Sequence, residues 1–321
     1  MTITDTTHRT TGDAPSTTTT VATVQRIERL NTASQRRVIE PDADVPGAVG
    51  EGRLVPRELS TLADLDVRLT EDQWAALSRE EIASVASSGI RFEAVLMAGF
   101  SDRIANAPEL VDPRVVYMLH EIGEETRHSR LFIRLIEQID PQATDAFAGQ
   151  LARFAFRTVT RRLAHRPAPL MVLVLAGEEI PDLLQKKLAD HPDTDPFVRA
   201  VNKYHRMEEA RHLSFARSVL PELWAEASPT DRWTVRYALP AVIRTMFEGM
   251  INPGVYPVVG LPAWATWRAM NASPSRVALR HEATSSVLRA LVDGGVLRPG
   301  RIPVGWRRLC GVDRHGRPVA G

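Results

Sequence analysis

The sequence predicts an all-α protein, and three observations support this fold class. Apolar residues recur at the three- to four-residue spacing of amphipathic helices, whereas the alternating apolar segments typical of strands are almost absent. Prolines and small polar residues mark helix starts and stops along the chain. A five-residue motif, Glu-Glu-x-Arg-His, occurs twice, at residues 124–128 and 208–212, within two of the predicted helices.

The individual helices follow from these signals in chain order. Residues 21–69 contain several prolines and predict one N-terminal helix followed by an extended segment that wraps the domain. Thr70 is the predicted N-cap of a helix that runs to about residue 106, with Gly89 as a potential break. Further helices are predicted over residues 113–140, 143–164, 168–190, 195–219, 229–250 and 275–292.

Composition divides the chain into three regions. Residues 1–20 are rich in Thr and contain no apolar stretch that could serve as a signal peptide, so they predict a disordered tail. Residues 21–294 predict a single helical domain. Residues 295–321 predict a basic, irregular C-terminal tail, which either packs or is solvated, or else forms a docking face for an acidic redox partner.

Charge and cysteine content exclude several function classes. The chain of 321 residues has 40 basic and 39 acidic residues, so nucleic acid and anionic membranes are not expected partners. The most apolar run, residues 170–176, is too short to span a bilayer. Because Cys310 is the only cysteine, a metal site must use imidazole and carboxylate ligands. These features predict a cytoplasmic protein.

The repeated motif contains Glu-x-x-His, which places a carboxylate and an imidazole one helical turn apart on one face. A single copy is weak evidence, and the duplication makes the signal specific. Two Glu-x-x-His helices, with a further Glu from each of two other helices, form the di-iron carboxylate site of ferritin-like bundles. The sequence therefore predicts a ferritin-like di-iron helical bundle with extra flanking helices.

Candidate ligands follow from helical register. His205, Glu209 and His212 fall at i, i+4 and i+7 on one helix face that also carries apolar residues. Burying three such groups is costly unless a cation compensates them, and a divalent metal does so. Glu125 and His128 form the matching pair on the helix of the first motif.

The sequence does not decide whether some neighbouring residues are also ligands. Glu124, next to Glu125, is one such residue. Aligning the two motifs places Glu121 opposite His205, with His120 one residue out of step. We therefore expect His120 to be a surface group or to lie behind the ligands.

Each of the other two bundle helices offers an acid. Glu178 and Glu179 follow an apolar run in which an unpaired carboxylate is poorly tolerated, so one of them is a predicted ligand. Glu93 is the only Glu between residues 82 and 108 and is the corresponding acid of the first bundle helix.

The order Glu, Glu-x-x-His, Glu, His-x-x-x-Glu-x-x-His resembles the p-aminobenzoate N-oxygenase family of di-iron enzymes, which has an extra histidine compared with ferritins. The resemblance covers about residues 70–250, and it favours Glu178 over Glu179. The metal ligands that it implies are Glu93, Glu125, His128, Glu178, His205, Glu209 and His212.

The resemblance implies a non-haem di-iron monooxygenase of biosynthetic pathways. Such an enzyme would use O2 and electrons from an external donor or reductase to oxidise the nitrogen of an arylamine-like small molecule, giving a hydroxylamine, nitroso or nitro group. The cofactor would be two Fe ions, although these ligands also accept Mn. We expect a homodimer that binds neither nucleic acid nor membrane.

Two groups of neighbouring side chains complete the expected site. Arg127 and Arg211 are predicted to pair with Glu124 and Glu208, either behind the ligands or as plain surface ion pairs. Apolar residues near ligand positions are candidates to line the substrate cavity, or are simply core: Phe92, Met97, Phe100, Tyr204 and Met207.

Two alternative functions are also consistent with the motifs. The same di-iron core could hydroxylate a C–H bond of a pathway intermediate. A ferritin-like iron-binding protein is the second alternative, but it predicts a shorter chain and has no need of a third histidine.

Overall fold

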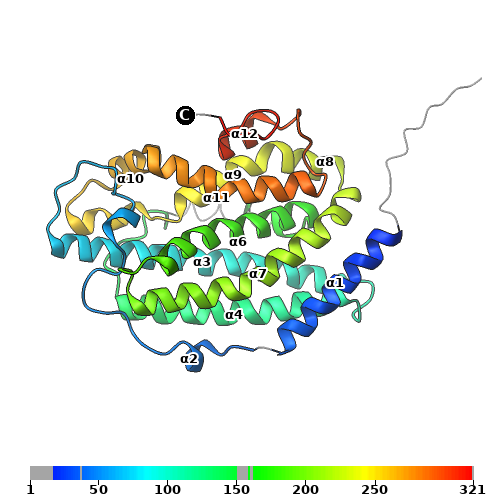
Figure 1. Ribbon diagram of the computed structural model, residues 1–321, viewed down its shortest axis with the longest axis horizontal. Helices are drawn as coiled ribbons and strands as arrows, with labels where there is room; N and C mark the ends of the chain where they lie inside the picture. Colours follow the sequence, from blue (N-terminus) through cyan, green and yellow to red (C-terminus); the bar gives the residue numbers. More distant parts are fainter. Residues whose placement is uncertain (1–16, 37, 150–157, 160–161, 320–321) are drawn as a thin grey trace, which may run out of the picture.

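The structure, a computed structural model, describes residues 17–36, 38–149, 158–159 and 162–319. Within these ranges the chain is helical, with one isolated bridge between Val312 and Pro318 and no strand, which confirms the predicted all-α class. Helix α3 packs along α4, and α6 packs along α7, so that these four long helices lie side by side (Figure 1). Their bounds are Glu71–Ala105, Pro113–Ile139, Pro167–Asp190 and Pro196–Ala225.

Shorter helices flank this bundle on two sides. Helix α1 (Thr17–Arg36) crosses α4 and α7, and α11 (Pro274–Asp293) packs against α6 on the opposite side (Figure 1). The remaining helical segments are α2 (Pro41–Asp44), η1 (Arg57–Leu59), α8 (Pro229–Trp233), η2 (Thr234–Ala238), α9 (Leu239–Gly249), η3 (Pro253–Val255), η4 (Pro257–Val259), α10 (Ala263–Ala272) and α12 (Val304–Cys310). The extra flanking helices expected from the sequence are therefore present.

Local capping sets where the bundle helices begin. Thr70 forms a capping box with Gln73, because its hydroxyl accepts from Gln73 N at 3.2 Å while the Gln73 side chain accepts from Thr70 N at 2.9 Å. Asp112 and Asp195 cap α4 and α7, each followed by a proline at the first helical position. Helix α6 is buried over almost all of residues 168–180, as expected of a helix that is apolar on every side.

Helix α3 does not break at Gly89. A Cβ at this position would lie 3.1 Å from the ring of Phe132 on α4. Gly89 therefore permits close packing of α3 against α4, and the helix continues without interruption from Glu71 to Ala105.

The predicted helix over residues 143–164 is wrong at its start. Residues 140–149 form no helix, because Glu80 of α3 accepts hydrogen bonds from the backbone N–H groups of Gln142 and Ala143 at 2.6 and 3.1 Å and holds the chain open. Residues 158–159 and 162–164 are helical, and the rest of the predicted helix lies outside the described residues.

Two predicted helices differ from the structure near prolines. Helix α7 does not stop before Pro221 but continues to Ala225, since a proline near a helix end costs only one hydrogen bond. The single helix predicted over 229–250 is interrupted by the π-helical turn η2, in which Leu239 N–H bonds to the Thr234 carbonyl just before Pro240.

The C-terminal region is not an irregular tail. It contains α12, whose Trp306 is fully buried and donates its indole N–H to the Val235 carbonyl at 2.9 Å. Leu309 and Cys310 are buried beside it. The region from 295 to 319 therefore packs onto the helical core, and α10 is a further helix that the sequence did not indicate.

The helical domain also begins earlier in the chain than predicted. Helix α1 begins at Thr17, so four residues of the predicted Thr-rich tail belong to a helix. Residues 1–16 lie outside the described residues.

One helix of the described chain, α3, is long and apolar enough to cross a membrane by length and composition alone. Core helices of water-soluble proteins meet the same criterion. In this fold α3 packs along α4 and carries the buried carboxyls of Glu80, Glu81 and Glu93.

Candidate metal centre

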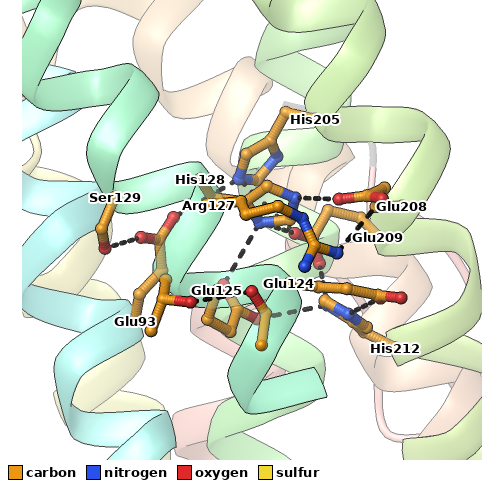
Figure 2. Close-up of polar contacts among 12 residues, drawn as sticks. Glu93, Glu124, Glu125, Arg127, His128, Ser129, His205, Glu208, Glu209 and His212 are labelled. Carbon is orange, nitrogen blue, oxygen red and sulfur yellow. Dashed lines mark hydrogen bonds and ion pairs between the residues drawn. The ribbon is translucent and has the colours of Figure 1, made fainter. Parts of the chain in front are cut away.

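The four bundle helices place seven acidic and imidazole side chains together in the protein interior. Each of these residues is at most 4 % exposed. Those labelled in Figure 2 point toward one another between the helices. They are the seven residues selected from the sequence: Glu93 of α3, Glu125 and His128 of α4, Glu178 of α6, and His205, Glu209 and His212 of α7.

Their ligand atoms form two groups, each compact enough to hold one metal ion. Glu93, His128 and His205 form the first group. The second group is Glu125, Glu178, Glu209 and His212. Within each group the candidate atoms lie within 4.8 Å of one another.

Two carboxylates join the groups. In Glu125, Oε2 lies 3.3 Å from His128 Nδ1 and Oε1 lies 3.2 Å from His212 Nδ1. Glu209 is arranged alike, with Oε1 3.2 Å from His128 Nδ1 and Oε2 2.9 Å from His212 Nδ1. Each carboxylate thus presents one oxygen to each group, the geometry that bridges two metal ions.

Polar partners behind the histidines fix which ring nitrogen faces the centre. His128 Nε2 donates to Glu208 at 2.9 Å, and His212 Nε2 donates to Glu124 at 2.8 Å, so both rings turn Nδ1 inward. His205 is oriented the other way. Its Nδ1 donates to the Gln185 side-chain oxygen at 3.0 Å, which leaves Nε2 facing the centre.

The two arginines of the repeated motif bind the acids behind the histidines, as predicted. Arg211 lies 2.9 Å from Glu124 and 3.4 Å from Glu208, and Arg127 lies 3.8 Å from Glu208. Tyr204 adds a hydroxyl hydrogen bond to Glu208 at 2.9 Å. These contacts position the two acids as acceptors for the ring N–H groups.

The pKa values show how strongly the buried charges depend on one another. Burial lowers the pKa of His128 and His212, but the surrounding carboxylates outweigh burial and raise both pKa values well above the ordinary range. Burial opposes ionisation of Glu124, yet the hydrogen bond from His212 and the charge of Arg211 lower its pKa to about 2. Burial, together with the charge of Glu209, raises the pKa of Glu178 well above its usual value.

The donor chemistry of the two groups and their atoms that lack a hydrogen bond both fit a pair of divalent ions. Several buried atoms within the two groups have no hydrogen-bond partner, which is costly without a cation. They are Glu93 Oε1, Glu125 Oε1, Glu178 Oε1, Glu209 Oε1 and His205 Nε2. Carboxylate and imidazole donors suit iron or manganese.

Other candidates lie outside the groups. Glu179 pairs with Arg217 instead, so the geometry separates it from Glu178. His120 is half-buried and belongs to neither group, as expected. Glu121 is fully buried next to the centre. Gln185 was not identified from the sequence as part of the site. Its position two helical turns after Glu178, on the same face of the same helix, could have indicated it.

A cavity of about 1250 Å³ adjoins the centre. It is lined by Glu93, Glu178 and His205 and by apolar side chains that include Phe92 and Leu173. Of the five lining residues expected from the sequence, only Phe92 lines it. The other four do not: Phe100 lies in the core, Tyr204 bonds to Glu208, Met207 is partly exposed, and Met97 lies elsewhere on α3.

Comparison with known families agrees with this geometry. The family model described as P-aminobenzoate N-oxygenase AurF matches residues 21–295. The chain belongs to the AurF family.

The helical di-iron fold is that of the AurF family. The family also implies an oxygenase that acts on a small molecule with O2. Uncharacterized protein Rv0885 of Mycobacterium tuberculosis is 27% identical over 242 residues, which cover 72% of this chain and 70% of that protein. Uncharacterized protein Mb0909 of Mycobacterium bovis is similar to the same extent.

Proposed function

We propose that this AurF-family protein is a di-iron N-oxygenase that oxidises the nitrogen of an aromatic amine. The observation that carries the proposal is the pair of ligand groups joined by Glu125 and Glu209, together with a third histidine, His205, at the first group. When bound, two ferrous ions would supply the electrons and the open coordination positions that activate dioxygen.

The seven ligands have distinct parts in this proposal. Glu93, His128 and His205 would hold the first ion, and Glu178 and His212 the second, with Glu125 and Glu209 between them. The four carboxylates of this set balance the positive charge of two divalent ions. Glu124, Glu208 and Gln185 would hold the three imidazoles in the tautomers that ligation requires.

The overall reaction balances as follows. An arylamine, O2, two electrons and two protons yield the arylhydroxylamine and water, with one oxygen atom entering the new N–O bond. Further rounds with the same stoichiometry in O2 would give the nitroso or nitro product. An external reductase is the proposed source of the electrons.

The cavity supports an aromatic substrate. Its apolar residues, such as Phe92 and Leu173, would contact the ring, and Glu93, Glu178 and His205 place the ligand groups at its wall. An apolar cavity of roughly 150 Å³ holds one benzene ring. A cavity of about 1250 Å³ therefore leaves room for a substituted or multi-ring amine.

The test is anaerobic reconstitution of the full chain with Fe(II), followed by metal counting and exposure to O2 with a reductant and a panel of arylamines. Two irons per chain and hydroxylamine, nitroso or nitro products by mass spectrometry would support the proposal. Glu178→Gln should lose activity, whereas the adjacent Glu179→Gln, which lies outside the ligand groups, should keep it. Products hydroxylated only at carbon would favour the C–H hydroxylase instead.

A further inference from the structure

Glu121 of α4 is a buried carboxylic acid without a partner. Its side chain is 0 % exposed, and neither carboxylate oxygen has a hydrogen-bond partner. Most buried carboxyls in the described chain differ: Glu80 and Glu81 accept hydrogen bonds, and Glu124 pairs with Arg211. An unpaired carboxylate is expensive to bury, so Glu121 requires either a proton or a cation.

Helical register places Glu121 on the metal-facing stripe of α4. Glu121, Glu125 and His128 fall at i, i+4 and i+7, the same spacing as His205, Glu209 and His212 on α7. The two stripes face each other across the centre, with Glu125 and Glu209 joining the two groups. In this alignment Glu121 corresponds to His205, the residue that completes the first group.

The charges around Glu121 belong to the second group. After burial itself, the side chains with the largest effect on its pKa are His212, Glu125 and Glu209, all three of which belong to that group. Burial is the main cause that raises this pKa to about 8 in the absence of a cation. Glu121 is not one of the four members of the second group, but the charges that act on it most strongly are theirs, whereas His205 belongs to the first group.

We propose that Glu121 is an additional ligand of the second metal ion, the counterpart of His205 at the first. The inference rests on the metal-binding part of the proposed function. It makes the two ions unequal, because the first would be rich in nitrogen donors and the second rich in carboxylate oxygens. Oxygen donors favour the harder, more highly charged state of an ion. Glu121 would therefore stabilise the oxidised centre more than the reduced one.

The experiment compares metal-free wild type with Glu121→Gln, Glu121→His and the neighbouring control His120→Gln. Each full-length protein is titrated anaerobically with Fe(II) by calorimetry, and the midpoint potential of the loaded centre is measured. Glu121→Gln should bind the first equivalent normally and the second about tenfold more weakly or worse, with a higher midpoint potential. His120→Gln should behave as wild type.

Two further readouts separate ligation from a structural role. Metal-free Glu121→Gln should melt at or above the wild-type temperature, because it lacks the unpaired buried carboxyl. Glu121→His supplies a neutral nitrogen donor and should recover part of the second affinity. Wild-type affinities for both equivalents in Glu121→Gln, or equal losses at both, would overturn the inference while leaving the proposed function intact. A wild-type protein that binds no Fe(II) would overturn both.

Discussion

The carboxylate of Glu124 on α4 lies 2.8 Å from Nε2 of His212 on α7. The reverse contact also exists, since Glu208 of α7 accepts from His128 of α4 at 2.9 Å. Each helix therefore orients the histidine of the other, and Figure 2 shows both contacts. Both acids are the first Glu of the repeated Glu-Glu-x-Arg-His motif, so the motif encodes a candidate ligand and the support for the opposite ligand.

Loss of these acceptors should weaken metal binding without removing a ligand. Glu124→Gln or Glu208→Gln leaves a neutral partner for the imidazole, and we expect metal affinity to fall about 10- to 100-fold. Anaerobic Fe(II) titration measures the change. Glu137→Gln, an exposed substitution on the same helix, is the control. Unchanged affinity in both variants would show that the contacts do not position the histidines.

Gln185 should act on one metal position only. The side-chain oxygen of Gln185 accepts a hydrogen bond from Nδ1 of His205. Gln185→Leu should therefore weaken binding of the ion in the first group and leave binding of the ion in the second group at wild-type affinity. Gln185→Glu retains an acceptor oxygen and should restore binding. The two stepwise affinities, measured by calorimetry, test this. Equal losses at both positions in Gln185→Leu would argue against a specific role for the hydrogen bond.

The metal-free protein should lose stability as pH rises. The pKa values of His128 and His212 are raised, so their contribution is complete below their unfolded pKa of about 6.5 and is lost as pH rises through the folded values. Glu121 acts in the same direction between its unfolded pKa of 4.5 and about 8. Thermal melts of metal-free protein from pH 5.5 to 8.5 should therefore show a falling midpoint.

Metal-loaded protein is the control for this pH effect. Ligation requires deprotonated imidazoles, so metal affinity should increase over the same pH range. A metal-free midpoint that rises with pH would contradict the assignment of protonated histidines in the empty cluster.

Gly177→Ala should destabilise the packing of α6 against α3 through Phe92. A Cβ at Gly177 would lie 1.6 Å from the Phe92 ring, which must move into the cavity or push α6 away from α3. Overpacking of this kind costs about 1–3 kcal/mol in the free energy of unfolding. Gly249→Ala has open space around the new methyl group and is the matched control. Urea unfolding measures both, and equal effects would refute the packing argument.

Trp306 should hold the C-terminal region onto the core. Its ring is fully buried and its indole N–H bonds to the Val235 carbonyl, so Trp306→Ala should cost about 3–5 kcal/mol in the free energy of unfolding. Trp233→Ala removes a ring that is 58% exposed and should cost far less. A loss in Trp306→Ala as small as that in Trp233→Ala would mean that α12 contributes little to stability.

The sequence alone was sufficient for the fold class and for gathering the candidate ligands. Helix class followed from apolar periodicity, and the duplicated motif supplied Glu125, His128, Glu209 and His212 because ligand spacing on a helix is a local property. Residues 143–149 were mispredicted as helical because a distant residue, Glu80, accepts hydrogen bonds from the backbone of Gln142 and Ala143. The same limit explains α12, whose helix depends on burial of Trp306 against the core.

Only the tertiary structure decided how the helices face one another. Aligning the two motifs places Glu121 at the position that corresponds to His205. Only the packing of the folded bundle shows that Glu121 is buried without a hydrogen-bond partner. Arg217, which lies on another helix, pairs with Glu179, whereas Glu178 lies in the second candidate group. A sequence determines which side chains share a helix face, whereas packing between helices determines which of those side chains meet.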